Sequence, residues 1–434
     1  MSTEFTQNSA PSNASTLSKP KTIASITIGN GLEFYDFVVY SFFAKMIGEL
    51  YFPIEDKTGQ LLLSFATFGV GFLMRPLGGI IIGLYADKYG RKPAVALTLW
   101  LMGLSSLVFV FTPTYAQIGV WAPIMILLAR LVQGFAIGGE MGASTAFLME
   151  FADKGSRGFY ASWAGFSQGF GSLVAALVGV TLTGILSPEA LISYGWRIAF
   201  LVGVIIIPVG IFIRRKLPET ADVAPSEYNE SKALRSLFTE HAYALTACIL
   251  LMIGLASSTY IIIYYLSNYA MTVLMLAPFY AIMTGVAASL VQVVLSPFSG
   301  MLSDKIGHRR LVLLSRIFLL IIAYPCFLVI THYQTIGVVL AMVSILSIPL
   351  SVTSPATMVV VTELLPKSIR ATGLSISYCV AIAIFGGFAQ FFAALLIKWT
   401  NNPNAPAFYL IGCGLISLLG LYFARKAKEH EWEK

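Results

Sequence analysis

The sequence predicts an all-α membrane protein with twelve transmembrane helices in two pseudo-symmetric six-helix bundles. Three observations lead to this fold class: the composition, the apolar runs and an internal repeat. Hydrophobic residues make up 57% of the 434 residues and charged residues only 11%, whereas a soluble domain carries roughly 25% charged residues. Apolar runs long enough for a helix to cross ~30 Å of hydrocarbon recur from end to end.

The apolar runs define the expected helices in chain order, and polar or charged turns separate them. The turn GLYADKYGRK (83–92) follows the second run, and the polar stretch 215–239 separates the sixth run from the seventh. The twelve expected helices are residues 22–48, 60–86, 93–112, 119–149, 157–186, 194–214, 240–269, 277–304, 309–331, 336–364, 368–398 and 405–425.

This pattern divides the chain into two bundles, a linker and two tails. The first 21 residues are rich in Ser, Thr and Asn and lack the apolar core of a signal peptide, so we expect a disordered cytosolic tail. The expected segments are the tail 1–21, the N-terminal bundle 22–214, the cytosolic linker 215–239, the C-terminal bundle 240–425 and the cytosolic tail 426–434.

The distribution of Lys and Arg predicts the orientation in the membrane. Of the 28 Lys and Arg residues, 21 lie in the two tails or in the loops that follow the even-numbered helices. Because positive charge accumulates on the cytoplasmic side, we expect both termini in the cytoplasm. The net charge of +7 is therefore a topology signal, and we expect no nucleic-acid partner.

Two turn sequences occur twice, about half a chain length apart. GLYADKYGRK (83–92) resembles GMLSDKIGHRR (300–310), with four identical residues at an offset of 217. EFADKGSR (150–157) resembles ELLPKSIR (363–370), with three identical residues at an offset of 213. Both pairs lie on predicted cytosolic turns, so we infer a duplication of six helices. Two halves with an even number of helices are parallel repeats, as in two-bundle transporters.

The motifs give the chain a resemblance to the major facilitator superfamily. GLYADKYGRK resembles the family's signature for the loop between the second and third helices. RLVQGFAIG (130–138) resembles the motif of its fourth helix. The residues that match this second motif are Arg130, Gln133, Gly134 and Gly138.

One branch of that family is the most similar, the metabolite:proton symporters. GNGLEFYDF (29–37), RPLGG (75–79) and RLVQGFAIGGE (130–140) together resemble this branch, whose members carry citrate, 2-oxoglutarate, shikimate, or proline and betaine. The combination of FLMRPLGG, GFYASW (158–163) and AIFGGF (383–388) looks most like the citrate and tricarballylate carriers. The resemblance implies secondary active transport driven by a proton gradient, without a cofactor.

Four charged residues fall inside the expected N-terminal bundle at similar depth. A rise of 1.5 Å per residue places Glu33 and Arg130 each ~16 Å deep, near the midplane. Asp36 lies one turn from Glu33 on the same face, and Arg75 is slightly nearer the cytosol. Charges buried in a membrane persist only when they are paired, hydrated or neutralised. One interpretation is that these four residues form structural ion pairs.

The other interpretation gives the charges a part in transport. The pKa of a midplane carboxyl group depends on its hydration and on neighbouring charge, so Glu33 or Asp36 could exchange a proton as its surroundings change. An arginine freed from that acid could bind a substrate carboxylate through two parallel hydrogen bonds. In the wider family the arginine that resembles Arg130 is implicated in proton coupling. We therefore predict proton coupling by Glu33, Asp36 and Arg130.

Polar side chains at mid-depth complete the expected substrate site. Gln168, Tyr260, Tyr264 and Asn268 lie at or beyond the middle of helices that would face a central cavity, although a helix–helix hydrogen bond is an alternative role for Gln168. Ser354 precedes Pro355, which indicates a hinge in the tenth helix. The expected substrate-binding residues are Arg75, Arg130, Gln133, Gln168, Tyr260, Tyr264 and Ser354.

Charged residues near the cytosolic ends are too shallow to touch a midplane substrate. We expect them to form a gate that holds the bundles together when the transporter faces outward. The predicted gate residues are Asp87, Arg91, Glu140, Glu150, Arg157, Asp304, Arg309, Glu363 and Arg370. The resemblance to the major facilitator superfamily implies that the ninth helix, which carries Arg316, supports the bundle from outside. We therefore expect Arg316 to extend its charge toward the membrane surface.

The function that we predict is import of an organic carboxylate, citrate or a related tricarboxylate, with protons by alternating access. Alternatives are a proton-coupled carrier of a dicarboxylate, shikimate, or proline and betaine, or a sensor of the same fold that transports nothing. We expect no enzymatic activity, no cofactor and no metal site, because no catalytic or ligand pattern is visible. The expected partners are a small organic acid, protons and membrane lipid, for a monomer in a bacterial inner membrane.

Overall fold

The computed structural model describes residues 19–432, apart from residues 90, 139–154, 216–229 and 367–368. Every regular element in these described ranges is a helix. The described part of each of the twelve expected spans is helical apart from short turns. Within the described residues, nine helices are long and apolar enough to span a membrane, and Ala96–Phe111 is a shorter apolar helix.

The first half of the chain supplies the helices before the linker. The second expected span is a single rod made of two segments that meet at Met74. The elements are α1 (Lys19–Phe42), α2 (Ala44–Tyr51), α3 (Lys57–Leu73), α4 (Arg75–Tyr89), α5 (Arg91–Phe111), α6 (Tyr115–Ile118), α7 (Trp121–Gly138), α9 (Arg157–Ile185), α10 (Pro188–Ala190), η1 (Leu191–Gly195) and α11 (Trp196–Arg215).

The second half contains two rods with π-helical segments in their middle, η2 and η3. A further helix, α12, lies in the expected linker. The elements are α12 (Glu230–Thr239), α13 (Ala242–Thr259), η2 (Tyr260–Tyr265), α14 (Leu266–Thr272), α15 (Pro278–Ile306), α16 (His308–Tyr333), α17 (Ile336–Leu364), α18 (Arg370–Ala381), η3 (Ile382–Gly387), α19 (Ala389–Thr400) and α20 (Ala405–Trp432).

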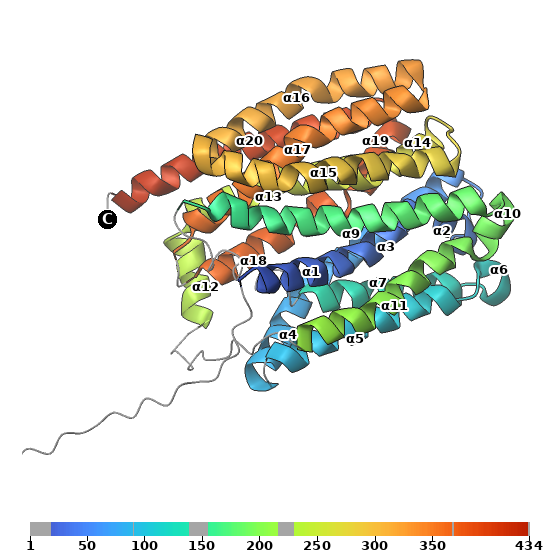
Figure 1. Ribbon diagram of the computed structural model, residues 1–434, viewed down its shortest axis with the longest axis horizontal. Coiled ribbons are helices and arrows are strands. Elements are labelled where there is room, and N and C mark those ends of the chain that lie inside the picture. The colour runs from blue at the N-terminus through green and yellow to red at the C-terminus, as the bar shows by residue number, and fades with distance from the viewer. Residues whose placement is uncertain (1–18, 90, 139–154, 216–229, 367–368, 433–434) are drawn as a thin grey trace, which may run out of the picture.

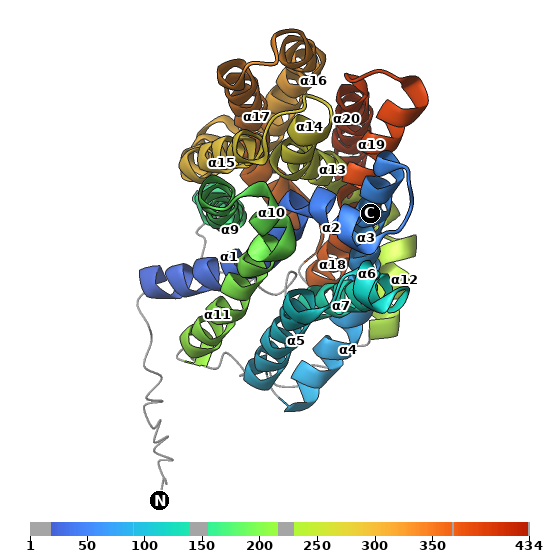
Figure 2. The same ribbon diagram turned by 90° about the vertical axis from the view of Figure 1, so that its right-hand side faces the viewer.

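The two halves meet along α9 and α15, which run side by side over their length (Figures 1 and 2). Small residues allow this approach: a Cβ atom added at Gly158 would lie 2.4 Å from the carbonyl oxygen of Gly300. The rod of α3 packs against η3 and α19 of the other half. Functional residues on these helices are therefore positioned at the interface between the halves.

Inside the first half, glycines let α7 lie against the α3–α4 rod. A Cβ atom at Gly134 would lie 1.6 Å from the carbonyl oxygen of Gly71, and one at Gly138 would lie 2.0 Å from that of Arg75. Close backbone contact through small residues is typical of helix packing in membranes. It brings Arg75 and Arg130 into the same layer of the bundle.

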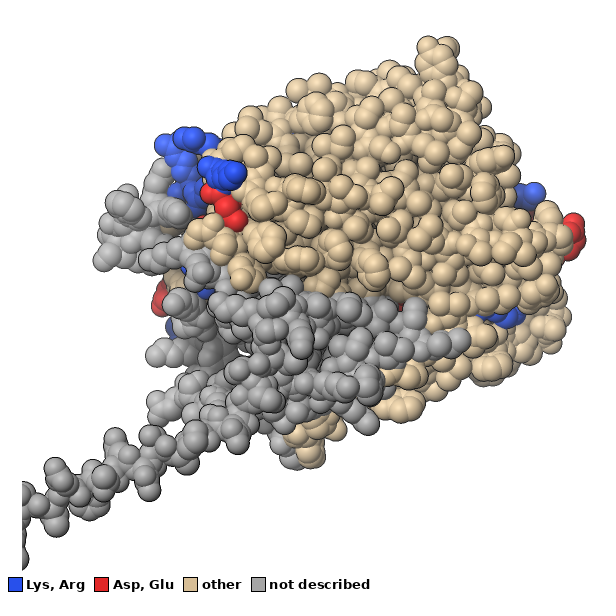
Figure 3. All heavy atoms as spheres, viewed as in Figure 1, with Lys and Arg blue, Asp and Glu red and all other residues tan. Residues whose placement is uncertain are grey.

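The described charged side chains lie mainly at the two ends of the molecule. In Figure 3, Lys and Arg gather at the end that carries α12 and the loop between α15 and α16, and fewer lie at the opposite end. The belt between the ends is uncharged on the face shown, apart from the atoms drawn in grey. We refer to the first end as the predicted cytosolic end and to the other as the predicted outer end.

Candidate functional site

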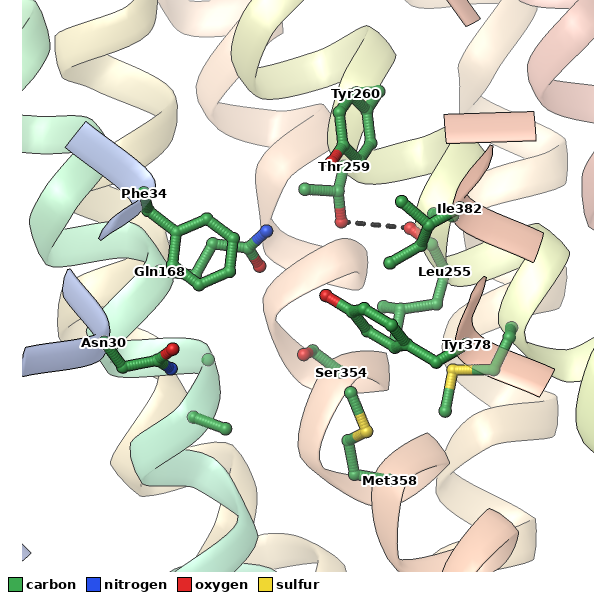
Figure 4. Close-up of a pocket in the computed structure, with 14 residues that line it drawn as sticks. Asn30, Phe34, Gln168, Leu255, Thr259, Tyr260, Ser354, Met358, Tyr378 and Ile382 are labelled. Atoms are coloured by element: carbon green, nitrogen blue, oxygen red, sulfur yellow. Dashed lines mark hydrogen bonds between the residues drawn. The ribbon is translucent and has the colours of Figure 1, made fainter. Parts of the chain in front are cut away.

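A pocket lies between the two halves and is lined by residues of α1, α9, α13, η2, α17, α18 and η3 (Figure 4). Its cavity volume is about 40 Å³, room for a few water molecules. The polar residues that line it are Asn30, Gln168, Thr259, Tyr260, Ser354 and Tyr378. Figure 4 shows the Tyr378 hydroxyl and the Gln168 amide pointing toward the same space.

Arg75 contacts two tyrosines of this pocket but does not line the pocket itself. Its guanidinium group interacts with the hydroxyl groups of Tyr260 and Tyr378. The side chain is 2% exposed, and its Nε and Nη1 atoms have no hydrogen-bond partner among the described residues. Arg75 is the cation next to the pocket, with donors that a bound anion could satisfy.

Gln168 is held in a chain of hydrogen bonds that crosses the interface. Its Nε2 atom donates to the Tyr264 hydroxyl at 3.3 Å, and its Oε1 atom accepts from Nε2 of Gln292 at 3.5 Å. Gln292 is buried, and its own Oε1 atom is unpartnered. Tyr264 thus contacts the site through Gln168, although it does not line the pocket itself.

Asp36 and Arg130 lie at the two ends of a buried hydrogen-bond chain. Ser106 donates to Oδ2 of Asp36 at 2.7 Å, and Gln133 Nε2 donates to the Ser106 hydroxyl at 3.4 Å. Arg130 Nη1 in turn donates to Oε1 of Gln133 at 2.8 Å. Gln133 is fully buried here and does not line the pocket. The predicted acid and arginine are therefore connected through Ser106 and Gln133.

The chain from Asp36 to Arg130 is separate from the pocket. Asn30 and Phe34 line the pocket from α1, whereas Asp36 faces α5 and α11, where a Cβ atom at Gly203 would lie 1.9 Å from its Oδ1 atom. The Arg130 guanidinium lies 3.6 Å from the centre of the Tyr40 ring. Cation–π contact of this kind stabilises a buried guanidinium, and no described carboxylate forms an ion pair with Arg130.

One aromatic ring is within cation–π distance of both arginines. The guanidinium carbon of Arg75 is 5.2 Å from the centre of the Phe37 ring, and that of Arg130 is 5.5 Å from the same centre. Phe37 therefore connects the arginine beside the pocket with the arginine of the buried chain.

Glu33 belongs to α1, but its side chain lies outside the described residues. The same holds for four of the predicted gate residues, which are Asp87, Arg91, Glu140 and Glu150. Their predicted roles stay predictions.

Two contacts join the halves at the predicted cytosolic end. Asp304 accepts hydrogen bonds from the backbone N–H groups of Gly158 at 2.7 Å and Phe159 at 3.0 Å, in the first turn of α9. A carboxylate is favourable at a helix N-terminus. Arg157 forms an ion pair with Glu363, with an N–O distance of 2.8 Å. These three predicted gate residues therefore lie at the interface.

The other two described gate residues bind within the second half. Arg309 donates to the carbonyl oxygen of Ala424 at 3.4 Å, and Arg370 donates to that of Leu365 at 3.2 Å. Neither bond connects the two bundles.

The expectation for Arg316 is wrong. Its side chain is 0% exposed and points into the second bundle, where Nη1 donates to the Gly254 carbonyl oxygen at 2.8 Å and to the Ser258 hydroxyl at 2.9 Å. The small residues Gly254 and Gly414 leave space for the guanidinium group. Counting residues along α16 gives depth but not direction, so the sequence could not show that this side chain turns inward.

Several polar residues of the site were not predicted. Asn30, Thr259 and Tyr378 line the pocket, and Ser106 binds Asp36. Asn30, in the motif GNGLEF, carried a signal because an amide is uncommon in an apolar span. A single Ser, Thr or Tyr in an apolar helix carries no comparable signal, because such residues also bind their own helix backbone.

Comparison with known proteins gives matches along nearly the whole chain. The Major Facilitator Superfamily model matches residues 27–377 and 284–434. The citrate-proton symporter of Klebsiella pneumoniae is 34% identical over 406 residues, covering 92% of this chain and 91% of the relative. The α-ketoglutarate permease of Escherichia coli strain K12 is 35% identical over 415 residues, 94% of each chain. The proline/betaine transporter of Salmonella typhimurium is 31% identical over 421 residues, 94% of this chain and 83% of the relative.

A solved structure supports the architecture independently. The crystal structure of a D-xylose-proton symporter superposes with a TM-score of 0.75 at 16% sequence identity, covering 93% of this chain and 96% of the other. This likeness is one of fold alone. It confirms the predicted class, an all-α membrane protein of two six-helix bundles.

Proposed function

Because this chain belongs to the major facilitator superfamily, we propose that it imports an organic carboxylate together with protons by alternating access. Its relatives are transporters and not enzymes, as predicted. Within the proposal, citrate or a related tricarboxylate is the first substrate to test.

The observation that carries the proposal is that Arg75 contacts the tyrosines of the pocket. Arg75 has two buried nitrogen atoms, Nε and Nη1, without partners among the described residues, and it interacts with two pocket tyrosines. The described residues that line the pocket include no Asp or Glu. A substrate carboxylate that displaces a tyrosine hydroxyl would satisfy the guanidinium with charge-assisted hydrogen bonds. A zwitterion would also need a place for its ammonium group, which aromatic rings can bind. Three aromatic residues line the pocket, Phe34, Tyr260 and Tyr378. Arg75 therefore favours a carboxylate but does not exclude a zwitterion.

The relatives support the same substrate class without deciding it. Citrate-proton symporters at 34% and 33% identity and an α-ketoglutarate permease at 35% are named for carboxylates. Proline/betaine transporters at about 31% are the reason to keep a zwitterion as the rival substrate.

Proton coupling is assigned to the buried chain that begins at Asp36, with Glu33 as the second acid. Protonation of Asp36 would change the charge at one end of the chain and so change how firmly Gln133 holds Arg130. Phe37, whose ring is near both Arg130 and Arg75, would connect this change with the pocket. Binding of the substrate and binding of the proton would then strengthen each other through packing and charge, although the two sites do not touch.

The gate follows from the contacts between the halves. The hydrogen bonds to Asp304 and the Arg157–Glu363 ion pair hold the two halves together at the predicted cytosolic end. With a cavity of about 40 Å³, a substrate can enter only when the halves move apart. Breaking these contacts would open the pocket to the cytosol, which is the release step of an importer.

The proposal places the monomer in a bacterial inner membrane, with lipid around it and both termini in the cytoplasm. The Lys and Arg distribution supports this orientation. A reporter fused after Lys434 should be active in the cytoplasm, and one inserted at Pro113 should be active outside. Periplasmic activity of the C-terminal fusion would contradict the orientation.

The function is tested by uptake into proteoliposomes. Labelled citrate, tricarballylate, 2-oxoglutarate, shikimate, proline and betaine are offered with and without an imposed pH gradient. We expect a di- or tricarboxylate to accumulate only with the gradient. Accumulation of proline or betaine alone would replace the carboxylate proposal with the zwitterion one, and no gradient dependence would remove proton coupling.

A further inference from the structure

Three polar residues meet between the halves on the outer side of the pocket. They are Ser41 of α1, Asn268 of α14 and Gln390 of α19, which we call the amide cluster, and each is 0% exposed. Ser41 Oγ donates to Gln390 Oε1 at 3.0 Å, and Asn268 Nδ2 donates to the Ser41 carbonyl oxygen at 2.6 Å. We propose that the amide cluster is a second ligand site, which recognises a hydroxyl group of the transported substrate.

Each amide of the cluster has one polar atom without a partner. Oδ1 of Asn268 and Nε2 of Gln390 are buried and make no hydrogen bond within the part of the chain that the structure describes. Most buried polar groups in folded proteins have a partner, and an unsatisfied one is unfavourable. Both amides are hydrogen-bonded to the same serine. We infer that their two free atoms form hydrogen bonds in another state of the transporter.

The chemistry of the two free atoms fits a hydroxyl group. The Gln390 Nε2 atom is a donor and the Asn268 Oδ1 atom is an acceptor, and a hydroxyl group is the small substituent that accepts one hydrogen bond and donates another. A carboxylate could use only the donor, and an ammonium group only the acceptor. The pair therefore favours a hydroxylated substrate over the same molecule without its hydroxyl group.

The cluster is joined to the pocket by a single residue. Ser41 Oγ lies 3.4 Å from the Tyr264 carbonyl oxygen, and the Tyr264 hydroxyl accepts from the pocket residue Gln168. Asn268 is four residues beyond Tyr264, about one helical turn toward the predicted outer end. A substrate that enters from outside would meet the amide cluster before it reaches the pocket.

This inference rests on the proposed function only in its premise that a small polar solute passes between the halves. In this structure Ser41 of the first half is hydrogen-bonded to Asn268 and Gln390 of the second half. When the halves move apart on the outer side, the free atoms of the cluster become accessible. It need not be a citrate site, because the hydroxyl group is what it recognises.

The experiment compares substrates that differ by one hydroxyl group. Uptake of citrate and tricarballylate is measured for the full-length protein in proteoliposomes, and the ratio of the two Vmax/KM values is taken within each preparation. The same is done for 4-hydroxyproline and proline. For whichever pair the protein transports, we expect the wild type to prefer the hydroxylated compound roughly 5- to 100-fold, the range for one buried hydrogen-bonding pair.

Two near-isosteric variants remove the free atoms. Asn268→Leu and Gln390→Met should bring the ratio close to one, chiefly by lowering uptake of the hydroxylated substrate. Gln334→Met, an exposed amide at the same end, is the matched control and should keep the wild-type ratio. Because the ratio is internal to each preparation, a misfolded fraction does not alter it. Should both variants be inactive, Gln390→Asn, which keeps the amide, must change the ratio.

The outcomes separate this inference from the proposed function. Uptake of the proline pair alone overturns the carboxylate proposal, while the hydroxyl inference is decided by the hydroxyproline ratio. A wild type without preference within the carried pair overturns the inference and leaves carboxylate transport intact. A ratio unchanged in Asn268→Leu and Gln390→Met, or in Gln390→Asn when both of them are inactive, also overturns it.

Discussion

Asp36 and Arg130 are both fully or nearly fully buried, yet no direct ion pair between them is present in the described structure. Ser106 and Gln133 lie between them. A direct buried pair would hold both charges permanently, because breaking it leaves an uncompensated charge. A connection through two neutral side chains leaves Asp36 able to change its protonation without exposing Arg130, which keeps its contact with the Tyr40 ring.

The first prediction concerns the acid that couples the proton. Asp36→Asn fixes a neutral group that still accepts a hydrogen bond from Ser106, so substrate accumulation driven by pH alone should fall to the level set by diffusion. Exchange of substrate for substrate, which needs no net proton movement, should retain most of its rate. Glu33→Gln belongs in the same measurement, since either acid could be the coupling group. If one of these variants still concentrates substrate against its gradient, the acid that it lacks has a structural role only.

The second prediction separates the two arginines. Arg75→Lys keeps the charge but loses the planar fork that binds a carboxylate, so KM for the substrate should rise about tenfold or more, equivalent to the loss of roughly 1.4 kcal/mol. Arg130→Lys, away from the pocket, should reduce gradient-driven accumulation while KM for exchange changes little. A larger KM effect in Arg130→Lys would move the carboxylate contact to that residue.

Depth along a helix was a useful guide to single residues, whereas direction was not. Gln168, Tyr260 and Ser354, chosen because they lie at mid-depth, line the pocket. Gln133 and Arg316 are at comparable depth but face other helices. In an apolar bundle every face of a helix is apolar, so the sequence carries little information about which face points to the cavity.

At the scale of elements, close backbone contacts decide the packing of α7. The carbonyl oxygens of Gly71 and Arg75 occupy the positions where side chains at Gly134 and Gly138 would lie. Helix α7 carries Arg130 and Gln133, so this contact fixes where both side chains lie relative to α1 and α5.

The third prediction follows from that contact. In Gly134→Ala the new methyl group cannot fit without a backbone shift, and overpacking of this kind costs about 1–3 kcal/mol or more. We expect a lower midpoint of thermal unfolding in detergent. Gly412→Ala is the control, because a Cβ atom there meets nothing within 4 Å. Equal midpoints for the two variants would contradict the packing argument.

The order of the helices could be predicted from the sequence, but their breaks could not. Apolar length fixes where a helix crosses the membrane, which is why the described parts of all twelve expected spans are helical apart from short turns. The break at Met74 and the π-helical segments Tyr260–Tyr265 and Ile382–Gly387 depend on contacts with other helices. Gly386, for example, lies where a Cβ atom would be 3.0 Å from the Tyr260 ring. Such contacts are not encoded in local hydropathy.

At the scale of the whole molecule, the described residues form one ion pair between the halves at each end. Arg157–Glu363 lies at the predicted cytosolic end, and Lys398–Asp56 lies at the predicted outer end with an N–O distance of 2.6 Å. The hydrogen bond from Lys398 lowers the pKa of Asp56. The outer pair is therefore complete above the ordinary pKa of an aspartate, near 3.9, and is lost as pH falls through the lowered pKa. At neutral pH the Lys398–Asp56 pair is therefore intact.

The fourth prediction is that these two pairs oppose each other in the choice between inward and outward opening. Lys398→Met removes the outer pair and should raise the outward-open population, and Glu363→Gln should raise the inward-open one. Partly exposed pairs contribute about 0.2–1 kcal/mol, so each shift should be at most about fivefold.

Spin-label distances between Val120 and Trp399 would follow the outer end, and those between Leu84 and Ile306 would follow the cytosolic end. All four positions are exposed. The charge swap Arg157→Glu with Glu363→Arg rebuilds the cytosolic pair and should restore the wild-type distribution, which neither single variant can do. If Lys398→Met and Glu363→Gln shift the distances in the same direction, the pairs stabilise the bundle generally and do not select between its two openings.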